Sequence, residues 1–304
     1  MKRKLVKQGR NALTVTLPSE WTAKMGLKAG DEVDVNEFEG SLNVNAKKET
    51  QHKKIEFDAT KIKSFRNQYI SFFYHAGFDE VRIIYDDPKV LEVTNKKLNE
   101  LMGYEIVESG KDYFIIRDIS KVDQEEFDTI LRRSFILLKS MAAECLGAIR
   151  EQKYSRLKEI RQMEKTNNKF TDFCIRILNK KGYHDYKKTQ FLYIVVREIE
   201  RLCDNYKYIC DLFKDKDDKS VKMSDETMRF FEKANNYFES FYELFYKFDE
   251  DRLNRFIDMK DKLVEEGYSA MNSRKNEEAC LLHHLVNIVS QTFDLKGPYF
   301  EMNL

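Results

Sequence analysis

The chain contains few of the residues that interrupt helices. Its 304 residues include only three prolines and 11 glycines, and this scarcity favours long helices over an all-β fold rich in tight turns. The chain also lacks an apolar run of the roughly 18–20 residues that a membrane-spanning helix needs, and no signal peptide opens it. We therefore expect a cytoplasmic protein without membrane insertion.

An excess of charge of either sign is also missing. The 53 basic residues nearly balance the 52 acidic ones, so any electrostatic preference for nucleic acid or an anionic membrane must be local. The five cysteines show no C-x-x-C spacing, and their odd number indicates reduced thiols. The sequence shows no His/Cys metal cluster, no Gly-rich phosphate loop and no Ser-His or Cys-His pair. We therefore expect a protein that is not an enzyme.

The residues that are present divide the chain into three parts and predict a multidomain α+β fold. In residues 1–50, alternating apolar stretches around a short helix predict strands and a hairpin. Residues 51–120 follow the order βαβαββ, which predicts a small α/β sandwich that serves as a spacer or dimerisation unit. Residues 121–304 carry helical periodicity throughout. Because the first part is small and has little apolar surface, we expect it to need a partner chain.

The stretch at residues 189–213 has the clearest helical pattern. Seven apolar residues recur at alternating spacings of three and four: Leu192, Val195, Ile199, Leu202, Tyr206, Ile209 and Phe213. This spacing makes one apolar stripe along a helix. At about 100° per residue, Glu200, Asp204 and Asp211 fall within roughly 40° of one another, nearly opposite that stripe. Local ion pairs with neighbouring arginines would explain these carboxylates, and so would a hard cation bound by their oxygens.

This helix has a distant copy later in the chain. Residues 281–301 share its layout when Asp294 is placed on Asp204, and the helices that precede the two stretches also match. We therefore expect a tandem duplication of a helical unit, with repeats at about 121–215 and 220–304. The first helix of the second repeat is crowded with aromatic residues, which predicts a helix buried between the repeats or against a partner.

Local signals place several helix starts. Asp123 is expected to cap a long helix, a helix that follows Asp87-Pro88 has Pro88 in its first turn, and the second repeat opens after Ser224-Asp225. Ser19 is expected to cap a short helix over residues 21–25.

The segment from Arg197 to Asp204, followed seven residues later by Asp211, resembles the signature helix of the phosphate-uptake regulator (PhoU) family. The resemblance implies two tandem three-helix bundles with E/D-x-x-x-D motifs that bind divalent or iron-type metal ions. The metal ligands that it implies in this chain are Glu164, Asn168, Glu200, Asp204 and Asp211. The second repeat has Lys260 and Ser290 at two of the corresponding positions. We therefore expect any metal site to be confined to the first repeat.

Residues 1–50 resemble the AbrB/SpoVT swapped-hairpin DNA-binding domain. The resemblance rests on Arg3, Gly9-Arg10, the alternating strand that ends at Leu17-Pro18, Gly26-Leu27, Gly30-Asp31 and the Val33/Val35 strand. It implies an interleaved homodimeric β-barrel whose arginines contact DNA. The candidate DNA-contacting residues are Lys2, Arg3, Lys4, Lys7, Arg10 and Lys24. Two arginines that the family carries in the short helix fall here on Thr22 and Ala23.

Five of the six candidate residues precede the first acidic residue, Glu20. Doubled in a dimer, they would form a compact positive patch of the kind that supplies most non-specific DNA affinity. A basic N-terminus can instead serve to keep an edge strand soluble.

The combination of these two domains in one chain is similar to that of prokaryotic, and especially archaeal, PhoU-like regulators. The two resemblances imply a homodimeric transcriptional or signalling regulator of phosphate uptake that contacts duplex DNA and senses a signal or metal through its helical bundle. An alternative is a protein-interaction regulator of a phosphate transporter ATPase or sensor kinase, in which the N-terminal domain only dimerises. A third interpretation is a metal-storage protein or metal-dependent phosphatase.

Overall fold

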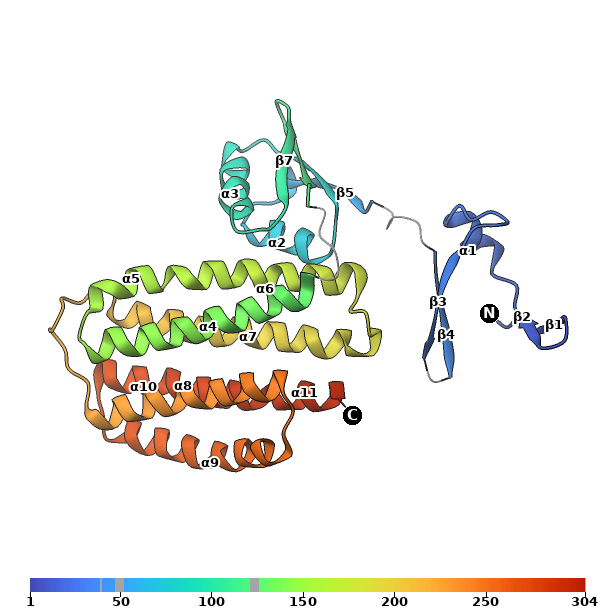
Figure 1. Ribbon diagram of the computed structural model, residues 1–304. Helices are drawn as coiled ribbons and strands as arrows, with labels where there is room; N and C mark the ends of the chain where they lie inside the picture. Colours follow the sequence, from blue (N-terminus) through green and yellow to red (C-terminus); the bar gives the residue numbers. More distant parts are fainter. Residues whose placement is uncertain (39, 47–51, 121–125, 304) are drawn as a thin grey trace. The chain divides into compact units, whose positions relative to one another are not determined.

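The computed structural model describes residues 1–38, 40–46, 52–120 and 126–303, and the chain forms two compact units, Met1–Lys53 and Lys54–Leu304 (Figure 1). The first unit contains short strands and one short helix, and the second combines a small sheet with a long helical region. The protein is therefore a mixed α+β molecule, as the sequence predicts.

The first unit consists of two β-hairpins and one helix. Strand β1 (Val6–Gln8) pairs antiparallel with β2 (Ala12–Thr14), and β3 (Val33–Phe38) pairs antiparallel with β4 (Ser41–Ala46). Helix α1 (Ser19–Lys24) lies between the two hairpins in the chain. In the described part of this unit, the hairpins form two separate two-stranded sheets and no side chain is buried. The described side chains of a single copy of this unit therefore form no core.

Two local predictions for this unit differ from the structure. Strand β2 ends at Thr14 instead of reaching Leu17-Pro18, because β1 pairs with it only as far as that residue. Ser19 is the first residue of α1 and not its cap, since Pro18 occupies the capping position in an extended conformation and no side chain caps the helix. Gly26, with a φ of +61°, follows the helix where the chain leaves it.

The α/β part of the second unit has the predicted order of elements. These elements are β5 (Lys54–Asp58), the 3-10 helix η1 (Ala59–Lys61), α2 (Gln68–His75), β6 (Glu80–Ile84), α3 (Pro88–Leu98), β7 (Tyr104–Ser109) and β8 (Tyr113–Asp118). The sheet order is β5-β6-β8-β7, with β5 parallel to β6 and the other pairs antiparallel. Ile70, Val81 and Phe114 belong to its buried core. Pro88 lies in the first turn of α3, as predicted, and the side chain of Asp87 caps this helix.

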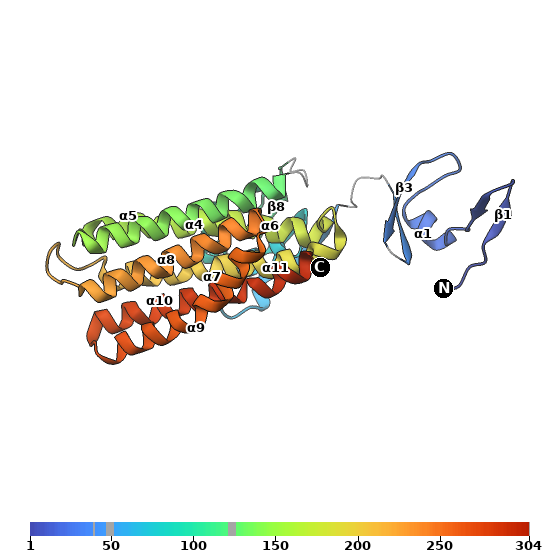
Figure 2. The ribbon, with the colours of Figure 1, turned by 60° about the horizontal axis from the view of Figure 1, so that its bottom comes forward.

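The helical part of the second unit consists of long helices that run along one common direction (Figures 1 and 2). Its helices are α4 (Glu126–Arg150), η2 (Tyr154–Arg156), α5 (Leu157–Ile160), α6 (Gln162–Lys181), η3 (Tyr186–Lys188), α7 (Thr189–Phe213), α8 (Asp225–Tyr246), α9 (Glu250–Asn272), α10 (Asn276–Asp294) and α11 (Lys296–Asn303). Helices α4, α6 and α7 pack on one another, and so do α8, α9 and α10. The first group lies within residues 121–215 and the second within residues 220–304.

Corresponding helices of the two repeats pack against each other. Helix α4 contacts α8, and α7 contacts α10, so one continuous apolar core spans both repeats. Asn235 of α8 ties the repeats together by polar contacts as well, because it accepts from Tyr206 Oη at 2.8 Å and donates to the carbonyl of Ala142 at 2.9 Å. Phe238 and Phe245 of α8 lie near Phe135 of α4 in this interface, whereas Tyr237 stacks on Phe256 of α9 within the second repeat.

Helix α8 begins after Ser224, where the sequence predicts that the second repeat opens, and Ser224 caps it. Ser224 Oγ accepts a hydrogen bond from the Thr227 amide at 3.2 Å, and it is extended, as a capping residue is. The predicted cap at Asp123 lies outside the described residues.

Candidate functional site

The candidate DNA-contacting side chains are all exposed in the first unit. Lys2, Arg3 and Lys4 precede β1, Lys7 lies within β1, and Arg10 lies in the turn that joins β1 to β2. These five form no ion pair with any described residue of the chain. Lys24 is exposed at the end of α1. Charges without intramolecular partners keep their full attraction for an external anion such as a phosphate group.

The hairpins of the same unit also expose apolar side chains. The largest exposed ones are Leu5, Val6, Leu13, Val15, Val35 and Leu42, with exposed fractions from 46% to 65%. Isolated exposed apolar residues are common, but here they occur in a unit whose described side chains include none that is buried. The first unit therefore combines unpaired positive charge with uncovered apolar surface.

In the second unit, two of the candidate metal ligands share a lysine. Glu164 on α6 is buried and Asp204 on α7 is half-buried. Lys207 Nζ lies 3.1 Å from Glu164 Oε1 and also pairs with Asp204 Oδ1. Burial lowers the pKa of Lys207, but Asp204 and Glu164 outweigh burial and raise that pKa above its usual value. The lysine is therefore held in its charged form between the two carboxylates.

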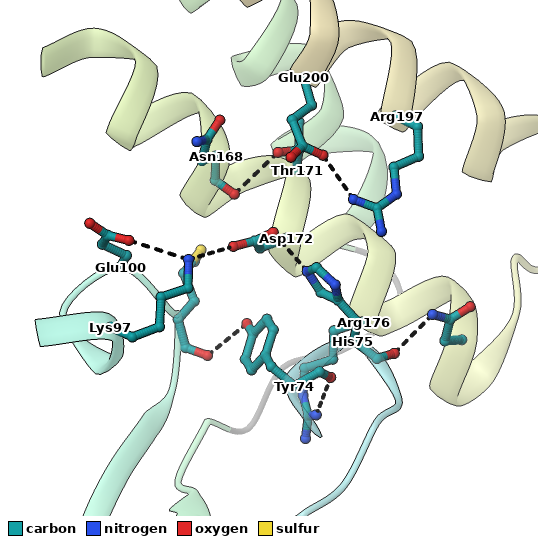
Figure 3. A network of polar contacts seen from close by, with 12 residues as sticks. Tyr74, His75, Lys97, Glu100, Asn168, Thr171, Asp172, Arg176, Arg197 and Glu200 are labelled. Atoms are coloured by element: carbon teal, nitrogen blue, oxygen red, sulfur yellow. Dashed lines mark hydrogen bonds and ion pairs between the residues drawn. The ribbon is translucent and has the colours of Figure 1, made fainter. Parts of the chain in front are cut away.

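The other candidate ligands have partners of their own. Asp211 pairs with Arg161 Nε and Lys214 Nζ, each at 2.6 Å, and although burial raises the pKa of Asp211, these two cations hold it below its usual value. Glu200 pairs with Arg197 at 3.0 Å (Figure 3). The predicted strip of carboxylates is thus present on α7, and each member is neutralised by a side-chain cation.

Asn168 places its amide nitrogen, and not its amide oxygen, against the carboxylate of Glu164. Its Nδ2 donates to Glu164 Oε1 at 2.8 Å, while its Oδ1 is buried without a hydrogen-bond partner among the described residues. Within the described ranges, no three His, Cys, Asp or Glu side chains come close enough together to hold a metal ion. The oxygens of Glu164 and Asp204 converge on Lys207 in this arrangement, and metal binding by these five residues stays a prediction.

The second repeat carries a cation at the position of Glu164. Lys260 of α9 lies 2.8 Å from Asp261, and its Nζ lies 5.4 Å from the ring centroid of Phe293. Asp294, the counterpart of Asp204, is the last residue of α10. Of the motif carboxylates Glu164, Glu200 and Asp204, this repeat keeps only the last, and in the same alignment Glu301 stands at the position of Asp211.

Sequence reasoning missed a buried polar network between α6 and the α/β part (Figure 3). Arg176 of α6 is only 4% exposed. Its guanidinium donates to Asp118 at 2.7 Å and to the carbonyls of Tyr74 and Phe78 at 2.8 Å each. It also lies over the rings of Tyr74 and Tyr104. An arginine in a helical pattern is ordinarily assigned to the solvent, so the sequence offered no signal for this burial.

A second group of contacts extends the same network along α6. Asp172 pairs with His75 Nε2 at 2.7 Å and lies 3.5 Å from Lys97 Nζ (Figure 3). Lys180 pairs with Asp79, and Asn179 donates to the carbonyl of His75 at 2.8 Å. The helix that carries Glu164 and Asn168 in its first half therefore holds the α/β part with its second half.

No protein-family model matches this chain. No curated protein and no solved structure matches it significantly either. Across the described helices, none combines the length and apolar character needed to cross a membrane.

Proposed function

We propose that this protein is a homodimeric regulator of phosphate uptake whose first unit contacts duplex DNA and whose helical part senses a signal. The proposal rests on one observation above all: the exposed basic side chains at the start of the chain have no ion-pair partners among the described residues. Such side chains supply the phosphate contacts that position a protein on DNA. The assignment to phosphate uptake comes from the resemblance of residues 197–211 to the PhoU signature helix.

Dimerisation is supported by the surface of the first unit. Apolar side chains such as Leu13, Val35 and Leu42 are more than half exposed there, and burying each would contribute on the order of 1.5–3 kcal/mol. A second copy of the same unit would cover these side chains and would bring two sets of basic residues together. The doubled set gives a denser positive patch than one chain presents.

DNA binding by the full chain across a salt series tests the proposal. We expect anisotropy of a labelled duplex to report binding at low salt, with a log affinity that falls by roughly 0.9 per contacted phosphate for each log unit of salt. The double variant Arg3→Glu/Arg10→Glu should weaken binding by roughly tenfold or more at low salt. Wild-type binding in this variant would refute DNA contact through the first unit.

The matched control changes the net charge equally at sites far along the chain. Lys89 and Lys262 are exposed in the second unit, so Lys89→Glu/Lys262→Glu should leave the affinity close to that of the wild type. An equal loss in both double variants would indicate a response to net charge alone, which contradicts a specific basic patch.

A second candidate function is protein interaction without DNA contact. One observation favours it: a groove of about 810 Å³ at the start of α7 is lined by Tyr186, Phe191, Tyr193 and Ile194 among other residues. Aromatic and aliphatic side chains of this kind are enriched at protein interfaces. Failure of the wild-type chain to bind duplex DNA at low salt would favour this function.

A further inference from the structure

Four carboxylates of the first repeat face four cationic side chains. Glu164, Glu200, Asp204 and Asp211 are paired with Arg161, Arg197, Lys207 and Lys214. The charges therefore balance within the chain. A hard cation relieves repulsion between clustered carboxylates, but here the side chains already supply the positive charge.

We propose that Lys207 is the resident cation of the first repeat and stands where the PhoU resemblance expects a metal ion, so that this repeat holds its carboxylates together without metal. The proposal concerns the helical bundle alone. It goes beyond the regulatory function, and it can hold or fail independently of DNA contact.

The surroundings of Lys207 provide carboxylate acceptors for two of its three donors, and an aromatic ring lies beside the charge. An ammonium group has three donors and no acceptor. Lys207 Nζ lies 3.1 Å from Glu164 Oε1, pairs with Asp204 Oδ1, and lies 4.9 Å from the ring centroid of Tyr208. Its side chain is 16% exposed and that of Glu164 is 9% exposed. A metal ion would have to displace an ammonium group that already contacts both carboxylates, and the displaced charge would stay tethered beside the ion.

Comparison of the two repeats supports the same role. When Asp294 is placed on Asp204, the counterpart of Lys207 is Gly297, so the second repeat lacks this lysine. It has instead Lys260 at the position of Glu164, beside Asp261 and near Phe293. The second repeat thus lacks both the carboxylate of Glu164 and the lysine that pairs with it, so this lysine occurs only in the repeat that has both carboxylates.

Metal content and thermal unfolding of the full chain test the proposal. After equilibration with Mn²⁺ and desalting, the wild type should hold no stoichiometric metal, and Mn²⁺ should not change its unfolding midpoint. Lys207→Met keeps the apolar stem and removes the charge. It should lower the midpoint by several degrees, because two carboxylates lose their partner. Lys207→Arg keeps a positive charge and should retain most of the midpoint.

Lys262→Met is the matched control, because Lys262 is an exposed lysine of α9. Its midpoint should stay near that of the wild type. The double variant Asp204→Asn/Lys207→Met should be less destabilised than Lys207→Met alone, since one uncompensated carboxylate is removed. The proposal is overturned by a stoichiometric divalent ion in the wild type that Glu164→Gln removes. It is equally overturned by midpoints that are the same for Lys207→Met and Lys262→Met. If Lys207→Met does not fold, the wild-type metal content still decides.

Discussion

At the residue scale, Arg176 is the side chain whose loss should cost the most stability. Its side chain is 4% exposed and forms an ion pair with Asp118 at 2.7 Å. Burial alone would lower the pKa of Arg176, but Tyr104 and Asp118 outweigh burial and raise that pKa. Arg176→Met would leave that carboxylate buried with an incomplete set of partners. We expect the free energy of unfolding to fall by about 3–5 kcal/mol in urea denaturation.

The control for this prediction is Arg229→Met, because Arg229 is exposed on α8 and forms no ion pair with the described residues. Its effect should stay within about 0.5 kcal/mol. Adding Asp118→Asn to Arg176→Met should recover part of the loss. A denaturation curve of Arg176→Met that overlaps with that of Arg229→Met would show that the network contributes little.

Sequence reasoning at this scale succeeded for side chains whose position depends on one helix. The angular spacing of Glu200, Asp204 and Asp211 places them on one strip of α7, and all three are half-buried there. It could not show that Lys207 reaches across to Glu164 on another helix, since that contact depends on how α6 and α7 pack. The burial of Arg176 escaped for the same reason.

At the element scale, two helical glycines provide opposite tests of helix packing. A Cβ on Gly267 of α9 would clash with Val286 of α10 and would lie 2.6 Å from Phe230 Cζ of α8. A Cβ on Gly147 of α4 would meet nothing within 4 Å. We expect Gly267→Ala to destabilise the fold by about 1–3 kcal/mol, and Gly147→Ala to stabilise it by roughly 0.5–1 kcal/mol through helix propensity.

Thermal or urea unfolding of both alanine variants beside the wild type checks this prediction. The two substitutions add the same methyl group to a helix, so a difference in sign isolates the close approach of α9 to its neighbours. Destabilisation by Gly147→Ala, or none by Gly267→Ala, would contradict the packing described for these helices.

Elements with strong local signals could be predicted from the sequence, and elements that depend on pairing could not. The long helices follow from apolar periodicity, as in α7, and α8 begins after Ser224, where the sequence predicts that the second repeat opens. The short strand β2 ends at Thr14 although the alternating pattern runs further, because a strand extends only as far as its partner does. The sheet order β5-β6-β8-β7 likewise results from tertiary pairing that periodicity does not report.

At the scale of the whole molecule, the two units differ in how far a single chain completes them. The unit Lys54–Leu304 has two buried cores, one in the α/β part and one through both helical repeats. The α/β part, which the sequence suggests is a spacer or dimerisation unit, is bound to α6 through Arg176 and Asp172. The described side chains of the first unit include none that is buried. Stability of the molecule should therefore reside in residues 54–304.

This difference predicts separate consequences for folding and assembly when the first unit is removed. Residues 54–304 alone should keep cooperative thermal unfolding and the helical circular dichroism signal, because their cores are complete.

Light scattering after size exclusion should give a dimer for the full chain and a monomer for residues 54–304. In the full chain, Leu13→Asp/Val35→Asp should also give a monomer, because charged groups would be placed where a second copy covers apolar surface. Ile257→Asp, at a side chain of α9 that is 37% exposed, should leave the dimer intact. A dimer of residues 54–304 would instead place the interface in the second unit and would remove the support that the first unit gives to a paired basic patch.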